Sequence, residues 1–222
     1  FYRFNLLTQA YETLKRLPFP GQVDSSSDII YDGSDHIYIQ GFSSYTTKFY
    51  KYTISTDTWT ALTDSTYSSG GYSKLIWTNS NLIYHLTGSS FEQYSITGNN
   101  WTTLTGPSNA VYSRTPIWTG GDYIFVPRGY ATTDFYRYSI SGNSWGTMTA
   151  TPVNIGDASY RVASMAWNGS DYLYLSNSNG SDNPITYRYS ISGNSWYTLP
   201  GSSCGNTDNG GMWNVYTNGQ LI

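Results

Sequence analysis

One eleven-residue segment recurs along the chain and constrains its fold more than any other feature. FYRYSISGNSW occupies residues 135–145 and returns, without its first residue, as YRYSISGNSW at 187–196. FYKYTISTDTW at 49–59 and FEQYSITGNNW at 91–101 are looser copies, and FYRFNLLTQAY at 1–11 aligns with them. The tryptophans that end the four copies are Trp59, Trp101, Trp145 and Trp196. A segment that returns roughly every 45 residues indicates a repeat architecture.

A second aromatic series follows the same period and consists of Tyr31, Trp77, Trp118, Trp167 and Tyr216. Its members end short apolar segments such as KLIW and SMAW. A polar turn follows (DGSD, TNSN, TGGD or NGSD), and then an alternating run such as HIYIQ or YLYLS. Alternating aromatic and β-branched residues between Gly/Asn/Asp/Ser turns predict β-hairpins, and no window shows a helical period.

Each period thus holds four short extended segments, which predicts an all-β fold: a β-propeller of four-stranded antiparallel blades, with about five repeats visible. We expect one propeller domain over residues 1–222. Its full blades would cover 25–64, 70–106, 112–150 and 160–201, with half-blades at 1–18 and 210–222. A single blade cannot bury both faces of its sheet, so the recurring aromatic residues should fill the space between neighbouring blades. The structural repeat anchors would be the tryptophans of both series.

The repeat resembles the kelch family over essentially the whole chain. The resemblance rests on an alternating strand, a tyrosine-containing strand, a polar turn, and then tryptophan with a hydrophobic residue three positions later, as in Trp59 with Leu62 and Trp145 with Met148. Kelch repeats usually carry a Gly-Gly pair after the second strand. The corresponding positions here read QGF at 40–42, LTG at 86–88, PRG at 127–129 and SNS at 176–178. This departure makes the chain a divergent relative, and function transfers poorly from fold alone.

The two ends of the sequence both fall inside a repeat. Residues 1–17 match the third and fourth strands of a blade, and TNGQLI at 217–222 aligns with TNSNLI at 78–83. We expect the sequence to be a window on a longer polypeptide of six to eight blades. The alternative is a five-bladed ring that lacks a short connecting segment.

The composition excludes some functions. Only 11% of the residues are charged and the net charge is −3, with 11 Lys and Arg, which argues against electrostatic binding of nucleic acid. No apolar run approaches the roughly 20 residues of a membrane span. Cys204 is the only cysteine, so it would be a plain loop thiol or bridge to a segment outside this sequence.

The loops that join the strands fall into two groups. In a propeller, the turns between strands one and two and between strands three and four share one face, and here they keep a constant length. The other connections share the opposite face and vary, as in ATPVNIGDASYR at 150–161 and LSNSNGSDNPIT at 175–186. Variable loops on a constant scaffold are where binding residues are expected. The alternative is that the lengths of these loops vary without any function.

No motif for catalysis or a cofactor stands out. Kelch enzymes resembling galactose oxidase hold copper with two histidines and two tyrosines, but His36 and His85 lie at different repeat positions, so we expect neither a metal nor a cofactor. A glycosidase pair could form from two of five carboxylates: Asp122, Asp134, Asp157, Asp171 and Asp182. Cations recur at one position as Arg3, Lys51, Arg137 and Arg188. Stacking on neighbouring tyrosines explains them better than an anion site does.

Three N-glycosylation sequons begin at Asn100, Asn168 and Asn179. Together with the scarcity of charge, they favour an extracellular or cell-surface location for a glycoprotein. The leading hypothesis is a non-enzymatic propeller module that binds a protein or glycan through its variable loops, within a larger surface, filament or virion-associated assembly. The alternative is a carbohydrate-active or oxidative enzyme with its site at the mouth of the ring.

Overall fold

The computed structural model describes residues 2–18, 27–41, 46–70, 72–112, 115–155, 163–177 and 185–200, and the backbone of 216–217 and 220–221. Throughout these ranges the regular structure is β-strand, with turns between the strands and no helix. The described part of the chain accordingly has no apolar helix of membrane-spanning length.

Sixteen of the strands form four antiparallel sheets, each with its four strands in sequence order. Sheet I contains β3 (Asp28–Tyr31), β4 (His36–Gln40), β5 (Phe49–Thr53) and β6 (Thr58–Ala61). Sheet II contains β7 (Lys74–Trp77), β8 (Leu82–Thr87), β9 (Ser90–Ser95) and β10 (Asn100–Thr103). Sheet III contains β11 (Ile117–Trp118), β12 (Tyr123–Pro127), β13 (Phe135–Ser139) and β14 (Ser144–Thr147). Sheet IV contains β15 (Ala163–Trp167), β16 (Tyr172–Asn177), β17 (Ile185–Ser190) and β18 (Ser195–Thr198).

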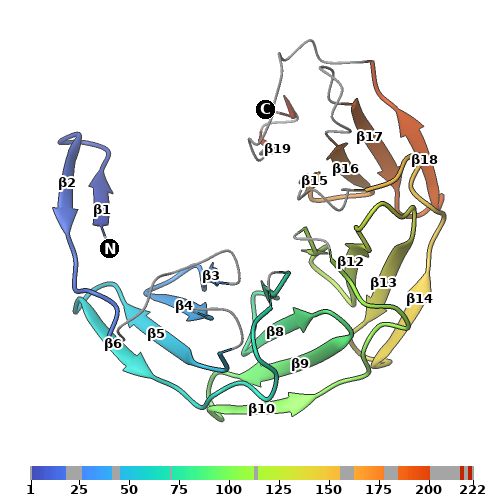
Figure 1. Cartoon of the computed structure of the whole chain (residues 1–222). Coiled ribbons are helices and arrows are strands. Elements are labelled where there is room, and N and C mark those ends of the chain that lie inside the picture. The colour runs from blue at the N-terminus through green and yellow to red at the C-terminus, as the bar shows by residue number, and fades with distance from the viewer. Residues whose placement is uncertain are drawn as a thin grey trace.

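Two hairpins complete the described structure: β1 (Tyr2–Asn5) with β2 (Ala10–Thr13), and β19 (Tyr216–Thr217) with β20 (Gln220–Leu221). The four sheets follow one another along an arc, with the fourth strand of each on the outer side (Figure 1). The arc is open between the β1–β2 and β19–β20 hairpins, so the described strands form the predicted four-stranded units but not a closed ring.

The turns between first and second strands and between third and fourth strands are all four residues long, as the sequence predicts, and each contains one residue in the left-handed region. Between the first and second strands this residue is Gly33, Asn79, Gly120 or Gly169, with φ from 53° to 79°. Between the third and fourth strands it is Asp57, Asn99, Asn143 or Asn194, with φ from 42° to 49°. Gly and Asn adopt this conformation at the lowest cost, so these residues set the register of the hairpins.

Aromatic side chains fill each junction between neighbouring sheets. The phenylalanine that begins or nearly begins a third strand packs edge-on or tilted against a tyrosine and a tryptophan of the next sheet. Ring centroids lie 4.9, 4.7 and 5.0 Å apart in the pairs Phe49–Tyr94, Phe91–Tyr138 and Phe135–Tyr189. They lie 5.0, 5.3 and 5.2 Å apart in Phe49–Trp101, Phe91–Trp145 and Phe135–Trp196. Each such pair adds about 0.5–1.5 kcal/mol beyond the area that it buries.

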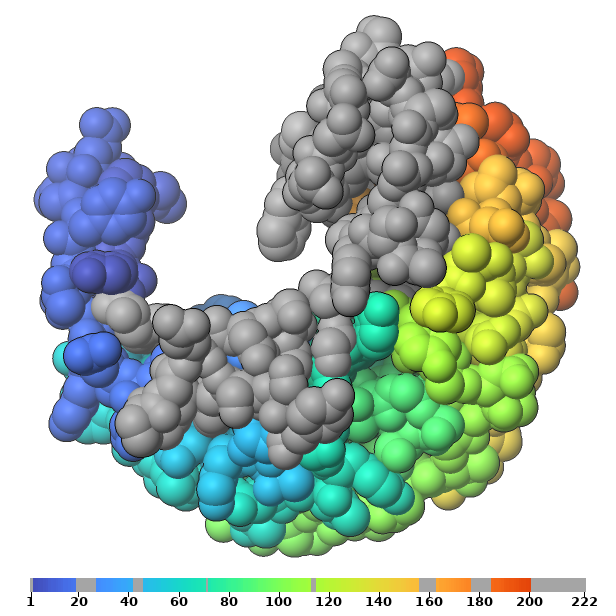
Figure 2. Space-filling model, in the orientation of Figure 1, coloured from blue at the N-terminus to red at the C-terminus, as the bar shows by residue number. Residues whose placement is uncertain are grey.

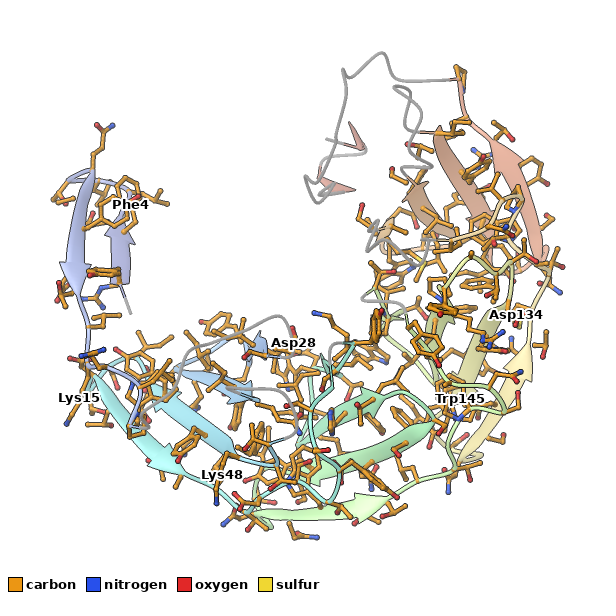
Figure 3. The ribbon with its side chains drawn as sticks, viewed as in Figure 1. Phe4, Lys15, Asp28, Lys48, Asp134 and Trp145 are labelled. Carbon is orange, nitrogen blue, oxygen red and sulfur yellow. The ribbon has the colours of Figure 1, made fainter. Side chains whose placement is uncertain are left out.

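The same tryptophans also bind the backbone of the preceding sheet. The indole Nε1 donates to a carbonyl oxygen just after that sheet's fourth strand. The distances are 2.9 Å for Trp101 to Thr63, 2.7 Å for Trp145 to Thr105 and 3.0 Å for Trp196 to Thr149. Trp59 donates in the same way to Lys15, which follows the β1–β2 hairpin (Figure 3). The β1–β2 hairpin is therefore bonded to sheet I through the same tryptophan contact that joins each sheet to the next.

A turn residue completes this junction. Its side-chain oxygen accepts both the hydroxyl of a buried tyrosine in its own sheet and a backbone amide of the preceding sheet. For Asn143 these donors are Tyr138 Oη at 2.9 Å and Thr105 N at 2.9 Å. The same pair of bonds occurs at Asp57, Asn99 and Asn194. We call the tryptophan and this Asn or Asp together the junction clamp.

The inner side of the arc has its own links. Asp28 lies between sheets I and II (Figure 3), where its carboxylate accepts from Lys74 Nζ at 2.8 Å and from Leu75 N at 2.7 Å. The tryptophans at the ends of the first strands instead bind within their own turns. The Nε1 atoms of Trp77, Trp118 and Trp167 donate to the carbonyl oxygens of Ser80, Gly121 and Ser170, respectively.

The clamp predicts a graded series at Asn143. Asn143→Ala loses two hydrogen bonds and replaces a residue that tolerates the left-handed region by one that does not, at φ 42°, so the free energy of unfolding should fall by about 2–4 kcal/mol. Asn143→Gly loses the same two hydrogen bonds, but glycine adopts the left-handed conformation without strain. The free energy of unfolding should therefore fall by only about 1–2 kcal/mol. Asn143→Asp, which copies Asp57, should stay within about 1 kcal/mol of wild type.

Urea unfolding of the three variants measures this order, with Ser144→Ala at the neighbouring exposed position as the control. Equal losses in all three Asn143 variants would show that the side chain is not a junction acceptor.

Candidate functional site

Antiparallel pairing divides the connections between two faces of the arc. The four-residue turns occupy the turn face. The loop face carries the connections from second to third strands and from each fourth strand to the next sheet. These connections differ in length: those from second to third strands, for example, span 41–48, 88–89 and 128–134. The described sheets form a wall around the hollow inside the arc (Figure 2). Two clusters on the loop-face side combine groups that could do chemistry or bind a ligand.

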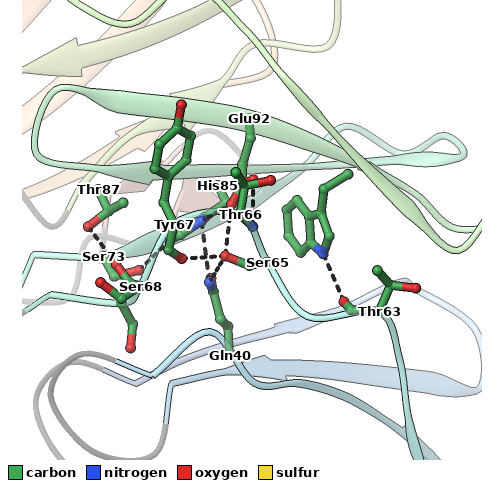
Figure 4. Close-up of polar contacts among 12 residues, drawn as sticks. Gln40, Thr63, Ser65, Thr66, Tyr67, Ser68, Ser73, His85, Thr87 and Glu92 are labelled. Atoms are coloured by element: carbon green, nitrogen blue, oxygen red, sulfur yellow. Dashed lines mark hydrogen bonds and ion pairs between the residues drawn. The ribbon is translucent and has the colours of Figure 1, made fainter.

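The first cluster is a buried polar network between sheets I and II (Figure 4). His85 on β8 pairs across the sheet with Glu92 on β9. His85 Nδ1 lies 2.8 Å from Glu92 Oε1, and His85 Nε2 lies 2.7 Å from Ser73 Oγ. Glu92 also accepts from Ser65 Oγ at 2.8 Å and from Thr66 N at 3.1 Å.

The hydrogen positions follow from what each partner can do. A carboxylate only accepts, so His85 Nδ1 carries the hydrogen toward Glu92, and Nε2 can accept the hydroxyl hydrogen of Ser73. Gln40 Nε2 donates to Ser65 Oγ at 2.8 Å. Gln40 Oε1 has no hydrogen-bond partner among the described residues, so the network is not fully satisfied.

Burial and hydrogen bonding act in opposite directions on Glu92. Burial favours the neutral acid and would raise its pKa, but hydrogen bonds from His85, Ser65 and Thr66, with the attraction of His85, outweigh it and hold the pKa of Glu92 below its usual 4.5. The carboxylate is therefore ionised in the folded protein at neutral pH. Its charge is stabilised by donors from two separate segments, β8 and the connection between β6 and β7.

Ser73, His85 and Glu92 stand in the order of a hydrolase triad: hydroxyl, imidazole, carboxylate. A nucleophile needs a substrate beside it, yet the side chains of His85 and Glu92 are fully buried and Ser73 is 4% exposed. The arrangement can therefore order the junction between two sheets, but it does not present the hydroxyl to a substrate. We assign it a structural role.

The motifs of the sequence did not predict this network, although the repeat contains a signal for it. His85 occupies the position of Ile39, Val126 and Leu175 in the other sheets. Glu92 occupies the position of Tyr50, Tyr136 and Tyr187. A histidine and a glutamate that replace apolar and aromatic residues in one copy only, and face each other in register, mark a local polar site.

The described carboxylates of the proposed glycosidase set bind locally. Asp122 accepts from Ser139 Oγ and Ser141 N, each at 2.7 Å, and these bonds lower its pKa. Asp171 repeats this with Ser190 and Ser192 in sheet IV. Asp134 pairs with Arg128 on the loop face at 3.0 Å. Asp122 and Asp171 therefore lock turns in different sheets, on the face opposite Asp134. Asp157 and Asp182 lie outside the described residues.

The recurring cations divide by environment. Arg137 lies 4.2 Å from the ring centroid of Tyr123, and Arg188 lies 4.6 Å from that of Tyr172. The predicted stacking is confirmed for these two. Arg3 instead pairs with Glu12 at 2.6 Å, and Lys51 is half-buried on β5.

The histidines do not come together, since His36 binds Asp32 at 2.8 Å in a turn of sheet I. Within the described ranges no three His, Cys, Asp or Glu side chains gather as metal ligands would. Among the sequons, Asn100 is exposed on β10, whereas Asn168 lies in a turn and accepts from Ser170 N and Tyr172 N. Asn179 and Cys204 lie outside the described residues.

The second cluster consists of three tyrosines on the loop face, from three different connections. Tyr112 lies between the other two: its ring centroid is 5.2 Å from that of Tyr72, at an interplanar angle of 89°, and 4.8 Å from that of Tyr130, at 34°. Tyr130 is 52% exposed, and the other two are half-buried. We call these residues the tyrosine cluster. The sequence offers 23 tyrosines and no pattern that selects these three.

Arg128 holds the tyrosine cluster in place. Its carbonyl oxygen accepts from Tyr112 N at 2.7 Å, and its Nε donates to Ala110 O at 3.2 Å. These two bonds join the β10–β11 connection to the β12–β13 turn, and the ion pair of Arg128 Nη1 with Asp134 links the two ends of that turn. This is a rigid, partly exposed aromatic surface with polar groups beside it.

Comparison with known proteins does not assign the chain. No protein-family model matches it, and no curated protein is significantly similar to it.

The electrostatics of Glu92 predict a change in acid stability. Because its pKa is lower in the folded state than in the unfolded state, the stabilisation is present above about pH 4.5 and is lost as the pH falls through the folded-state pKa. Glu92→Gln should lower the free energy of unfolding at pH 7 by about 1–3 kcal/mol. It should also flatten the dependence of that free energy on pH between about 5 and 3.

Urea unfolding across this pH range measures both effects, with Gln93→Ala on the same strand as the control. A Glu92→Gln curve that runs parallel to the wild-type curve would refute the assignment of this ionised carboxylate.

Proposed function

We propose that the four sheets are blades of a β-propeller and that the protein is a non-enzymatic binding module. The recurrence of one junction clamp supports the propeller, because identical contacts between successive wedge-shaped units rotate each unit by a similar amount about a common axis. The open arc of Figure 1 is the form that such a series takes. The kelch-like features of the repeat agree with this architecture.

The proposed binding surface is the loop face. The main support for this proposal is the contrast between the two faces of sheets I to IV: every turn-face connection has four residues, whereas the loop-face connections differ widely in length, as 88–89 and 62–73 illustrate. A scaffold that is constant in its junctions and turns and variable in one set of loops supports recognition by those loops. The tyrosine cluster lies in the variable set, and tyrosines provide large contact area with little loss of conformational entropy.

The rival hypothesis is a carbohydrate-active or oxidative enzyme. The described residues favour the binding module over it. The one triad-like arrangement, Ser73–His85–Glu92, is buried, and the described aspartates of the candidate carboxylate set are held by partners in separate sheets or turns. Either a protein or a glycan would suit the loop face as a partner.

We further propose that the module acts outside the cell or on its surface, as part of a larger surface, filament or virion-associated assembly. The three sequons support this location. The composition supports the same location, because only 11% of the residues are charged and most polar side chains are hydroxyls and amides.

A face-masking experiment tests the binding proposal and does not require the partner to be identified first. In a Cys204→Ser background, a single cysteine is placed on the loop face (Ser108→Cys) or the turn face (Thr97→Cys), both exposed positions, and coupled to polyethylene glycol. The probes are arrays of neutral and acidic glycans and of extracellular-matrix proteins. We expect binding to at least one array class, lost with the loop-face mask and kept with the turn-face mask.

If only the turn-face mask at Thr97 abolishes binding, the turn face binds the partner and the loop-face proposal is wrong. An unmasked protein that binds nothing on either array would overturn the proposed function.

A further inference from the structure

The β12–β13 turn contains two successive non-glycine residues with positive φ, a combination that no other described turn has. Tyr130 and Ala131 both have φ of 56°, a region that favours glycine. The shorter β8–β9 turn places Gly88 in this region, with φ of 58°. A tyrosine in a left-handed conformation persists only where the surroundings hold it, and such strain gathers at ligand-binding positions.

The surroundings here do hold the turn. Ala131 N donates to Ile155 O at 3.2 Å, Ile155 N donates to Thr132 O at 2.9 Å, and Thr132 Oγ1 donates to Gly129 O at 2.8 Å. These bonds fix a conformation that keeps Tyr130 half exposed, with its ring packed against the ring of Tyr112. The strain therefore results in an exposed aromatic ring in a defined orientation.

We propose that the tyrosine cluster is a stacking platform for a neutral saccharide, an inference that rests on the proposed binding function. The apolar C–H face of a pyranose ring packs on an aromatic ring, and its hydroxyls need planar polar partners nearby. Asp134 and Arg128, whose side chains are 40% and 24% exposed, provide such partners at the border of the cluster. Asn109 is exposed next to them and donates to Tyr136 Oη at 3.2 Å.

Two other ligand classes fit less well. A quaternary ammonium ion needs aromatic rings arranged around a space, but the rings here touch, with centroids 4.8 and 5.2 Å apart. A protein partner typically covers about 800 Å² on each side, which exceeds what one exposed and two half-buried tyrosines offer, at roughly 150–250 Å² for a whole ring. An acidic saccharide would need a net positive site, whereas the only described ion pair at the cluster, Arg128–Asp134, is neutral overall.

Tyr130→Gly separates a binding role from a structural one. Glycine relieves the strain at φ 56°, so the urea midpoint should stay unchanged or rise, while a saccharide loses its stacking surface. Cellohexaose, chitohexaose and maltohexaose are titrated as neutral probes, a heparin hexasaccharide as an acidic probe, and choline as a cation. Binding is followed by calorimetry and by saturation-transfer NMR on the sugar C–H protons.

We expect at least one neutral hexasaccharide to bind, with affinity at least ~10-fold weaker in Tyr130→Gly. Tyr130→Phe, which keeps the ring, should stay within about threefold of wild type. So should Tyr31→Ala, which removes an exposed tyrosine on the turn face.

Unchanged neutral-saccharide affinity in Tyr130→Gly would overturn the platform, as would binding of heparin or choline alone. If no saccharide binds while the loop-face mask still abolishes binding to arrayed proteins, the platform is wrong and the proposed function stands. If the unmasked protein binds neither array class, both are wrong.

Discussion

The structure depends on one interaction that recurs at each junction between the four described sheets: an aromatic ring from one sheet inserted against a tyrosine and a tryptophan of the next. The insertion alone would be tolerant of rotation, because dispersion and the hydrophobic effect have little directionality. The junction clamp supplies the direction. An indole N–H and a backbone amide, pointing opposite ways across the junction, fix how one sheet sits on its neighbour.

This arrangement explains how a chain with so few charges forms an ordered arc. The described ion pairs are few, and that of Arg3 with Glu12 is exposed, where it contributes little. Hydroxyl and amide side chains take over the linking roles. The turn aspartates illustrate this: Asp35, Asp122 and Asp171 accept from serines of the adjacent hairpin, which lowers each pKa. The surface therefore owes its polarity to groups that do not change charge near neutral pH.

Much of the fold could be predicted from the sequence because its determinants are local and repeated. The period of the tryptophans, the Asn- and Gly-containing turns and the alternation of YIFVP or YLYLS each specify a strand or a turn without reference to distant residues. The stacking of Arg137 on Tyr123 was predictable for the same reason, since the two occupy neighbouring strands.

The candidate sites were not predictable because they arise where the repeat is broken. The network needs Gln40 from β4, and Ser65 and Ser73 from the connection between β6 and β7, around the one copy that has His85 and Glu92. The tyrosine cluster needs three separate connections to meet, which depends on loop conformations such as that of Tyr130. A comparison of repeat positions could have drawn attention to His85 and Glu92, but nothing in the sequence distinguishes Tyr130 from the other tyrosines.

Native-state hydrogen exchange at three backbone amides tests the junction clamp most directly. Thr63, Thr105 and Thr149 are exposed residues that follow fourth strands, and each amide donates to an asparagine of the next sheet. If the junction clamp holds the sheets together, all three amides are protected to a degree comparable with amides inside the sheets. Asn143→Ala then abolishes protection at Thr105 while leaving Thr63 protected. Exchange of the wild-type amides as fast as in an exposed loop would contradict this role of the junction clamp.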